Sequence, residues 1–317
     1  MIIMKKYYST KEKSNHIIFK ILKKTIFFFL FLFLIYLYNK KNVLYRKNNM
    51  KHAILLLSSY GVEYLNNFLG QFNNDKRYDI YIHLDGKTKR DIDKNKTIIK
   101  SNIKFCQYIY HAKRFSIQMA DVMYELLSIA YKSDNYNYYH FFSESNYLVK
   151  SLDKFYNFFI EHNLNSYVNC SKTKNILYKN QSNLFYQGSQ WMSLHKNIVK
   201  KIISNKDLYN KYKDEIKNHT IIIKKGAIDE FIIQNLIILD ICNETPDKCN
   251  VINFNLCFIR WRGCKHVHCP NYLNIDNLSE DEINKIKEKY LIIRKINFKD
   301  TKSIELVNKL KNLSLKI

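Results

Sequence analysis

Two consecutive acids, Asp229 and Glu230, open an apolar stretch that reads IDEFIIQNLIILD. A carboxylate at the start of a helix can act as a general base that takes a proton from a hydroxyl nucleophile, an effect of about 10²- to 10⁴-fold on rate. Acids in the first turn of a helix are also favoured by the helix dipole alone. The pair is therefore a candidate catalytic site only if other segments of the chain build a pocket around it.

Further polar residues follow apolar runs that have the character of strands. Ser58 and Ser59 end the run HAILLLSS, and Asp85 ends YDIYIHLD. In parallel sheets, ligands bind outside the carboxyl ends of the strands, so these side chains are candidate ligand contacts. Asp85 could equally cap the turn that follows it. The two tryptophans, Trp191 and Trp261, are aromatic platforms or core residues.

The elements that must position these residues alternate between strands and helices. Continuous apolar runs are typical of buried parallel strands, and apolar residues at helical spacing predict the helices between them. The predicted strands are His52–Ser59, Tyr78–Asp85, Ile103–Tyr110, Tyr138–Phe142 and Cys257–Trp261, and the predicted helices are Val62–Phe72, Phe115–Tyr131, Ser151–His162 and Asp229–Leu239. This alternation predicts a single α/β domain with a mainly parallel central sheet. The chain has no GxGxxG and no GxxxxGK[ST] motif.

Taken in order, several segments resemble the core-2/I-branching β-1,6-N-acetylglucosaminyltransferase family, whose relatives include peptide O-xylosyltransferases. The matching segments are AILLLSS, YDIYIHLDGK, FSIQMADVMYELLSIA, YNYYHFFSESNYLVKS, FYQGSQWMSLHKNIVKKI, IDEFIIQNLI, FIRWRG and LIIRKINF. The resemblance covers residues 52–299, and its most specific feature is GSQW followed about forty residues later by the acid pair. It implies a GT-A-like fold and an inverting transfer from a UDP-sugar donor that needs no metal cofactor.

The resemblance also implies roles for residues on the donor side. Ser58, Ser59 and Asp85 would bind the nucleoside part of the UDP-sugar. Lys295 would lie on the diphosphate, and Arg294, the residue before it, is a further candidate donor contact of our own. Without a metal, such cations must neutralise the charge that develops on the departing diphosphate.

The remaining implied roles concern the reaction and the acceptor. Glu230 would be the general base that deprotonates a hydroxyl of a glycan or glycoprotein acceptor. Trp261 would lie against the acceptor sugar, and Trp191 and Asp229 are further candidate acceptor contacts. One carboxylate suffices for a single displacement, whereas retaining glycoside hydrolysis uses two carboxylates that flank the bond.

The chain departs from the family pattern at two places. Relatives usually have an Asp where the SESNY segment has Asn146, and an arginine near Pro270, where this chain reads HCPNYL. Arg260, Arg262 or Arg294 could supply the missing guanidinium. These departures motivate an alternative hypothesis, a binding protein that keeps the glycosyltransferase fold but has lost turnover.

The N-terminal segment is basic and apolar. Residues 1–51 hold twelve Lys or Arg against the single acid Glu12, which leaves +13 of the net charge of +24 for the rest. Residues 25–38 carry no charge and predict a transmembrane signal anchor that could extend to 17–38. We expect a cytoplasmic tail at 1–24, a stem at 39–51 and a glycosyltransferase domain at 52–317, as in a single-pass type II membrane protein with a Golgi-like lumenal domain. A cleaved signal peptide is the alternative.

Charge and cysteines allow two further interpretations. A basic surface attracts nucleic acid and anionic membranes, but no nucleic-acid-binding motif is present, and we expect no nucleic-acid partner. The seven cysteines cannot all pair within the chain, and five fall between residues 242 and 269. There, one or two disulfides could form in an oxidising compartment. The run from Cys264 to Cys269 matches no common zinc spacing, so no metal site is predicted.

Overall fold

The computed structural model describes residues 23–38, 50–72, 75–94, 97–98, 102–109, 111–113, 115–173, 185–219, 227–261 and 270–314. The chain divides into two compact units, Met1–Asn49 and Met50–Ile317. In the first unit, residues 23–38 form a helix whose side chains are all exposed. None of the helices within the described residues is both long enough and apolar enough to cross a bilayer. The transmembrane helix predicted at 25–38 is therefore not found there, and its extension through residues 17–22 lies outside the described part.

The second unit is an α/β domain built on a mixed sheet. Within the described residues the sheet has seven strands, in the order β10-β6-β9-β4-β1-β2-β3. Their bounds are β1 (His52–Ser58), β2 (Tyr78–Leu84), β3 (Ile103–Gln107), β4 (Tyr138–Ser143), β6 (Ser166–Tyr167), β9 (Ser193–His195) and β10 (Val251–Ile252). β1 pairs in parallel with both β2 and β4, and β2 pairs in parallel with β3. β9 is the exception, because it runs antiparallel between β4 and β6. The sheet is therefore mainly parallel, as the sequence predicts.

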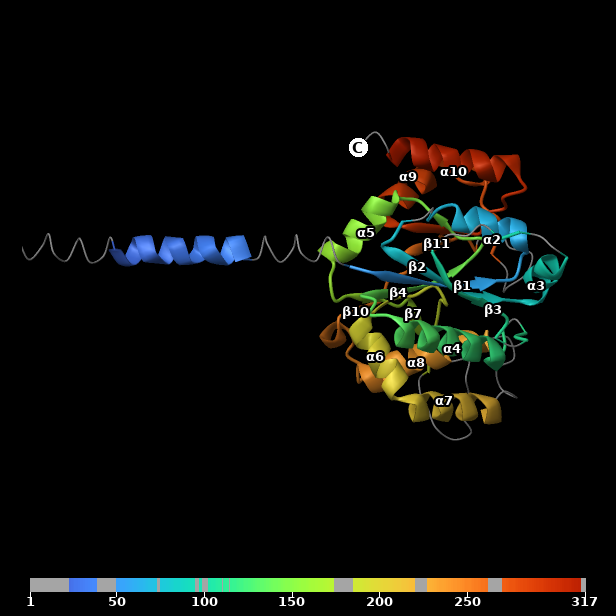
Figure 1. The fold of residues 1–317 in the computed structure, drawn as a ribbon, viewed down its shortest axis with the longest axis horizontal. Helices are drawn as coiled ribbons and strands as arrows, with labels where there is room; N and C mark the ends of the chain where they lie inside the picture. The colour runs from blue at the N-terminus through green and yellow to red at the C-terminus, as the bar shows by residue number, and fades with distance from the viewer. Residues whose placement is uncertain are drawn as a thin grey trace, which may run out of the picture. The chain divides into compact units, whose positions relative to one another are not determined.

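Helices cover both faces of this sheet (Figure 1). Alternate strand residues point to opposite faces, and each face of β1 packs on its own core. Ala53, Leu55 and Leu57 belong to one core, and Ile54 and Leu56 to the other. The first core includes α4 (Ile117–Ser133), α6 (Lys196–Ser204), α7 (Lys206–His219) and α8 (Ile232–Asn235), and the second includes α2 (Val62–Leu69) and α5 (Leu152–Glu161). This burial on both faces explains the continuous apolar run of β1.

A smaller sheet carries the C-terminal part of the domain. Its strand order is β11-β12-β5, with β12 parallel to β11 and antiparallel to β5. The elements are β5 (Tyr147–Leu148), β11 (Cys257–Ile259), β12 (Ile292–Arg294), α9 (Glu280–Lys289) and α10 (Thr301–Ser314). The two helices and β12 share a third apolar core. Because β5 directly follows β4, this sheet brings the end of β12 next to the carboxyl end of β4.

The remaining elements are short. They are α3 (Gly86–Asp93), the hairpin strands β7 (Cys170–Thr173) and β8 (Phe185–Gly188), the 3₁₀ turns η1 (Ile228–Glu230), η3 (Pro246–Cys249) and η4 (Ile275–Asn277), and the π-helical segment η2 (Leu236–Ile241). β7 pairs antiparallel with β8. The DxD sequence Asp91–Asp93 lies in α3. There Asp91 Oδ2 accepts a hydrogen bond from the N–H of Val62 at the start of α2.

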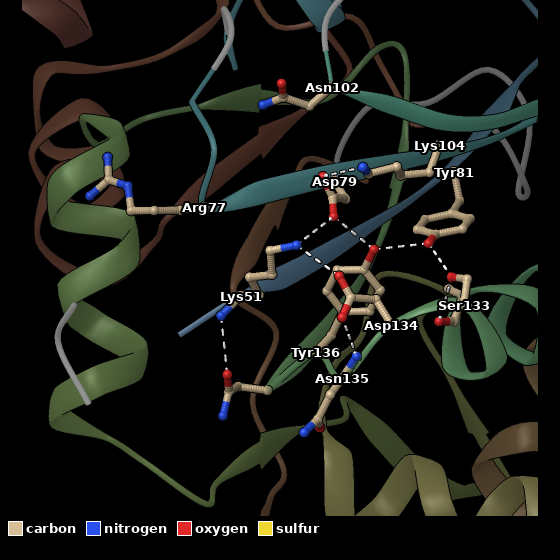
Figure 2. A network of polar contacts seen from close by, with 12 residues as sticks. Lys51, Arg77, Asp79, Tyr81, Asn102, Lys104, Ser133, Asp134, Asn135 and Tyr136 are labelled. Carbon is tan, nitrogen blue, oxygen red and sulfur yellow. Dashed lines mark hydrogen bonds and ion pairs between the residues drawn. The ribbon is translucent and has the colours of Figure 1, made fainter. Parts of the chain in front are cut away.

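A polar network closes the amino ends of the parallel strands (Figure 2). The buried Asp79 accepts a hydrogen bond of 2.8 Å from the Tyr136 hydroxyl and pairs with Lys51 at 3.3 Å. Lys51 also pairs with Asp134 at 2.7 Å, and the Tyr81 hydroxyl lies 2.8 Å from that of Tyr136. The network therefore satisfies a carboxylate that would otherwise be costly to bury, and it lies at the end of the sheet opposite to the predicted ligand contacts.

Candidate active site

A cavity of about 440 Å³ opens where β1, β2 and β4 end. Ser59, Asp85 and Ser143, each at the carboxyl end of one of these strands, line it. Seven of the nine predicted site residues contribute to the lining, namely Ser59, Asp85, Trp191, Asp229, Glu230, Trp261 and Arg294. This is the end of a parallel sheet at which α/β domains bind ligands. What each residue binds stays a prediction.

The other two predicted residues lie behind this lining. Ser58 is buried, and its hydroxyl lies 3.0 Å from that of Thr88 in α3. Lys295 is buried too, although a strand lysine is usually solvated. Its Nζ lies 5.0 Å from the centre of the Tyr60 ring and 4.4 Å from that of Tyr272. Tyr60 itself lines the cavity, so Lys295 is one side chain removed from it.

The acid pair lies in an irregular helical segment. The regular helix predicted over Asp229–Leu239 is wrong in detail, because η1, α8 and the π-helical η2 follow one another there. π-helical turns are frequent at functional sites. Both acids lie in the first turn of η1, where the helix dipole also favours them, and Asp229 there is almost wholly buried.

Two glutamines of the β7–β8 hairpin region hold the two acids. Gln187 Nε2 donates to Glu230 Oε2 at 3.3 Å, and Gln190 Nε2 donates to Asp229 Oδ2. Both glutamines also line the cavity. An amide N–H that donates to a carboxylate fixes its orientation without supplying a proton. The carboxylate of Glu230 is thus oriented at the cavity wall.

Buried side-chain amides of α8 hold the hairpin in position beside the acid pair. Asn235 Oδ1 accepts from the N–H of Tyr186, and its Nδ2 donates to the carbonyl of Tyr186, both at 2.8 Å. Gln234 Nε2 donates to the carbonyl of Ser189 at 3.1 Å. The hairpin also requires a glycine at position 188, because a Cβ there would lie 2.0 Å from the carbonyl oxygen of Asn169. The segments YQGSQW and IDEFIIQN therefore lie side by side, and these contacts explain the glycine of the first segment and the glutamine and asparagine of the second.

Arg294 is the cationic residue among the described residues that line the cavity. It comes from the end of β12 and is 6% exposed. Its guanidinium donates to the hydroxyls of Ser143 and Ser145. The guanidinium carbon also lies 4.1 Å from the centre of the Trp191 ring, which is cation–π contact. The acceptor role predicted for Trp191 stays a prediction. In the structure Trp191 contacts Arg294, which is predicted to bind the sugar-nucleotide donor.

The structure shows where the residues at the two departures from the family pattern lie. Asn146 is fully buried, accepts from the N–H and hydroxyl of Ser143 at 2.7 and 2.8 Å, and donates to Cys257 Sγ at 3.4 Å. It therefore braces the turn after β4 and does not line the cavity. Of the three substitutes for the missing arginine, Arg294 lines the cavity, Arg260 pairs with Glu282 at 3.3 Å, and Arg262 lies outside the described residues.

Asp85 serves as a cap and lines the cavity as well. Its Oδ1 accepts from the N–H of Gly86 at 2.7 Å, at the start of α3. The alternative role as a cap is therefore realised together with the predicted position. The run from Cys264 to Cys269 lies outside the described residues, and among the described residues no group of three or more His, Cys, Asp or Glu side chains could hold a metal ion.

The family model for the Core-2/I-branching enzyme matches residues 61–287, more than half of the chain. The chain belongs to the Core-2/I-branching enzyme family. Membership places it among glycosyltransferases and implies a sugar donor and a glycan acceptor. The matched residues include Asp85, Trp191, Glu230 and Trp261, whereas Arg294 lies beyond their end.

The other comparisons add little to this family membership. No curated protein matches the chain. Among solved structures, that of HddC from Yersinia pseudotuberculosis matches with 15% identity over 48% of this chain and 79% of that chain, at a TM-score of 0.28. A similarity this weak supports no conclusion about the branching enzyme.

Sequence reasoning missed several residues that build the cavity. Gln187 and Gln190 lie in the segment YQGSQW, which was singled out only as a motif. Glu144 in SESNY is wholly buried, and it accepts hydrogen bonds from the N–H groups of Ser59 and Tyr60 at the cavity wall. The available signal was an acid that directly follows an apolar strand, the same signal that selected Asp85.

Proposed function

We propose that this branching enzyme is an inverting glycosyltransferase with Glu230 as its general base. It would transfer GlcNAc or xylose from a UDP-sugar to a hydroxyl of a glycan or glycoprotein, without a divalent metal. The observation that carries the proposal is the placement of an oriented carboxylate, Glu230, and a buried guanidinium, Arg294, on the wall of one cavity.

Glu230 and Arg294 have the charges that a single displacement requires, a negative charge near the acceptor hydroxyl and a positive charge near the leaving diphosphate. The acceptor hydroxyl must lose its proton as it attacks the anomeric carbon, and a carboxylate within hydrogen-bond reach can accept it. The leaving diphosphate gains negative charge on the other side of the sugar. A guanidinium held by the hydroxyls of Ser143 and Ser145 can meet that charge without reorganising, which makes the stabilisation effective.

The rest of the lining suits an uncharged polyol acceptor. Trp261 is 50% exposed and lines the cavity, and an exposed aromatic face can stack on a sugar ring. Amide and hydroxyl groups of the hairpin region offer both donors and acceptors. They include Asn169, Ser171, Gln187, Ser189 and Gln190.

We also propose a membrane location of single-pass type II, with the catalytic domain in a Golgi-like lumen. Support comes from the apolar sequence 25–38 and from the exposed side chains of the helix at 23–38. Carbonate extraction of membranes from cells that express the full chain tests the proposal. Release of the protein into the soluble fraction would contradict it.

The activity assay uses the full chain purified in mild detergent. UDP release is followed with UDP-GlcNAc and UDP-xylose, in excess EDTA, over a panel of neutral glycan acceptors. We expect acceptor-dependent UDP release that EDTA does not abolish and that Glu230→Gln lowers at least 100-fold. Glu161→Gln, the same change at an exposed position in α5, is the matched control and keeps full activity. Tight binding of UDP-sugars without any transfer would favour the inactive binding protein instead.

A further inference from the structure

A buried carboxylate lies directly behind the cavity wall. Glu144 follows β4 and is fully buried. Its Oε1 accepts hydrogen bonds from two consecutive backbone N–H groups, those of Ser59 and Tyr60, while its Oε2 is buried without a hydrogen-bond partner. Because an unpaired polar atom is costly to bury, this arrangement needs an explanation beyond packing.

The two residues that Glu144 holds belong to the cavity wall. Ser59 and Tyr60 form the turn between β1 and α2, and both line the cavity. The ring of Tyr60 lies 5.0 Å from Lys295 Nζ. This turn therefore contacts Lys295, one of the two cations predicted to face the diphosphate.

The residues on either side of Glu144 hold the other cation. The hydroxyls of Ser143 and Ser145 accept from the Arg294 guanidinium, and the carbonyl of Ser145 accepts from the N–H of Ile296 at 3.0 Å. A single turn after β4 thus contacts both the Ser59–Tyr60 turn and the end of β12. Glu144 is the charged residue of that turn.

We propose that Glu144 is a positioning residue for donor binding, which fixes the Ser59–Tyr60 turn against Arg294 in the cavity wall and Lys295 behind it. The inference rests on the proposed function, since it assumes that a nucleoside diphosphate sugar binds at this wall. Glu144 does not line the cavity and therefore acts through the residues it holds. Its neutral isostere, glutamine, keeps one acceptor oxygen but loses the charge that strengthens both hydrogen bonds.

The ionisation of Glu144 makes its role measurable. Burial raises the pKa of Glu144 to about 7, and the N–H groups of Tyr60, Glu144 itself and Ser59 oppose this more strongly than the charge of Arg294 does. The titratable and charged side chains that interact with it are the Tyr64 phenol from α2 and the Arg294 guanidinium from β12. Protonation of Glu144 below pH 7 weakens the hydrogen bonds that it accepts from the turn. This effect on donor binding exceeds that of removing the negative charge of Glu144 from the neighbourhood of Arg294. Donor affinity should therefore fall on acidification.

The test is calorimetric titration of UDP-GlcNAc and UDP-xylose into the full chain at pH 8 and pH 6. The diphosphate diester of these probes does not titrate between the two values, so a change reports on the protein. We expect the affinity of the natural sequence to fall about fivefold between pH 8 and pH 6, from the weaker neutral hydrogen bonds. Glu144→Gln should bind about fivefold more weakly at pH 8 and show no further change at pH 6.

Glu63→Gln is the matched control, because Glu63 is an exposed acid of α2 that pairs with Lys299 at 2.8 Å. It should follow the natural sequence at both pH values. Thermal unfolding of each variant shows that it is folded at the titration temperature. Donor affinity of Glu144→Gln equal to that of the natural sequence at pH 8 overturns the inference, as does affinity that rises at pH 6. If neither probe binds the natural sequence at all, the proposed function itself fails, and the inference falls with it.

Discussion

Replacing Trp191 tests whether the cation–π contact with Arg294 prepares the donor side of the cavity. Trp191→Leu keeps an apolar side chain but removes the ring that lies 4.1 Å from the guanidinium carbon. Such contacts contribute about 0.5 to 1 kcal/mol when exposed and about 2 kcal/mol when desolvated. Arg294 is 6% exposed, so the desolvated value applies, less what leucine packing recovers. We expect about 1.4 kcal/mol, which is a tenfold weaker affinity for UDP.

The assay is calorimetric titration of UDP into the variant, combined with measurement of KM for donor and acceptor. Trp191→Leu should raise the donor KM and leave the acceptor KM within twofold of its original value, and Trp191→Phe should lie between the two. Trp261→Leu is the comparison variant, since Trp261 also lines the cavity and is half exposed, and it should change only the acceptor KM. An unchanged UDP affinity in Trp191→Leu together with a raised acceptor KM would refute the reasoning and return Trp191 to the acceptor side.

Three further predictions concern the base, the stability network and pH. Gln187→Leu frees the Glu230 carboxylate from its 3.3 Å hydrogen bond and should lower kcat about tenfold at an unchanged donor Kd, by steady-state kinetics and titration. Tyr136→Phe removes the hydroxyl that donates to the buried Asp79 and should lower the free energy of unfolding by about 2 kcal/mol in urea titrations. Burial lowers the pKa of His52 to about 3, the pKa values of His83 and His195 to about 4, and the pKa of His140 well below its ordinary value. These four histidines therefore stay neutral when folded. On acidification from pH 7.5 to pH 5.5, each of these histidines should lower the free energy of unfolding by about 1.4 kcal/mol. Glu144 offsets part of this loss, because its pKa is raised in the folded protein.

Each of these predictions has its own contrary result. Full activity in Gln187→Leu would show that Glu230 needs no support from the hairpin. A loss below about 0.5 kcal/mol in Tyr136→Phe would mean that the lysines Lys51 and Lys104 satisfy Asp79 without the hydroxyl. Donor affinity should in either case stay unchanged, because this network lies at the opposite end of the sheet. For pH the sign is fixed, because the unfolded chain binds protons at about pH 6.5 that the folded histidines do not. Stability that rises on acidification to pH 5.5 would contradict the burial of these rings.

The sequence was sufficient to predict the four neighbouring parallel strands of the large sheet and three helices that cover them. The strands β1, β2, β3 and β4 and the helices α2, α4 and α5 lie where apolar runs and helical spacing predict them. Such patterns are strong because both sheet faces are buried. β9 was not predicted, because its three residues, Ser193–His195, are too short to show a period.

The acid pair shows where local pattern fails. Asp229–Leu239 has a helical pattern of apolar residues, yet it divides into 3₁₀, α and π segments. Tertiary contacts decide this, because Asn235 turns inward to bind the backbone of β8, and Gln234 binds the carbonyl of Ser189 directly after it. No pairing rule within the segment predicts hydrogen bonds to residues more than forty positions away.

The candidate site was predicted largely through the family resemblance. The resemblance selected residues that the fold then brought to one cavity, such as Asp85, Glu230 and Trp261. It could not find Glu144 or the support given by Gln187 and Gln190, because those roles depend on which side chains meet across the fold. Ser58 lies behind the wall because side chains alternate along a strand, and only Ser59 faces the cavity.

The most direct test of the central claim is the rate of sugar transfer in Glu230→Gln. The assay follows acceptor-dependent UDP release by the full chain in excess EDTA, with UDP affinity measured on the same preparation. We predict a loss of at least 100-fold in kcat with UDP affinity unchanged, because Glu230 would act on the acceptor proton and not on the donor. Transfer by Glu230→Gln at the rate of the natural sequence would contradict the account.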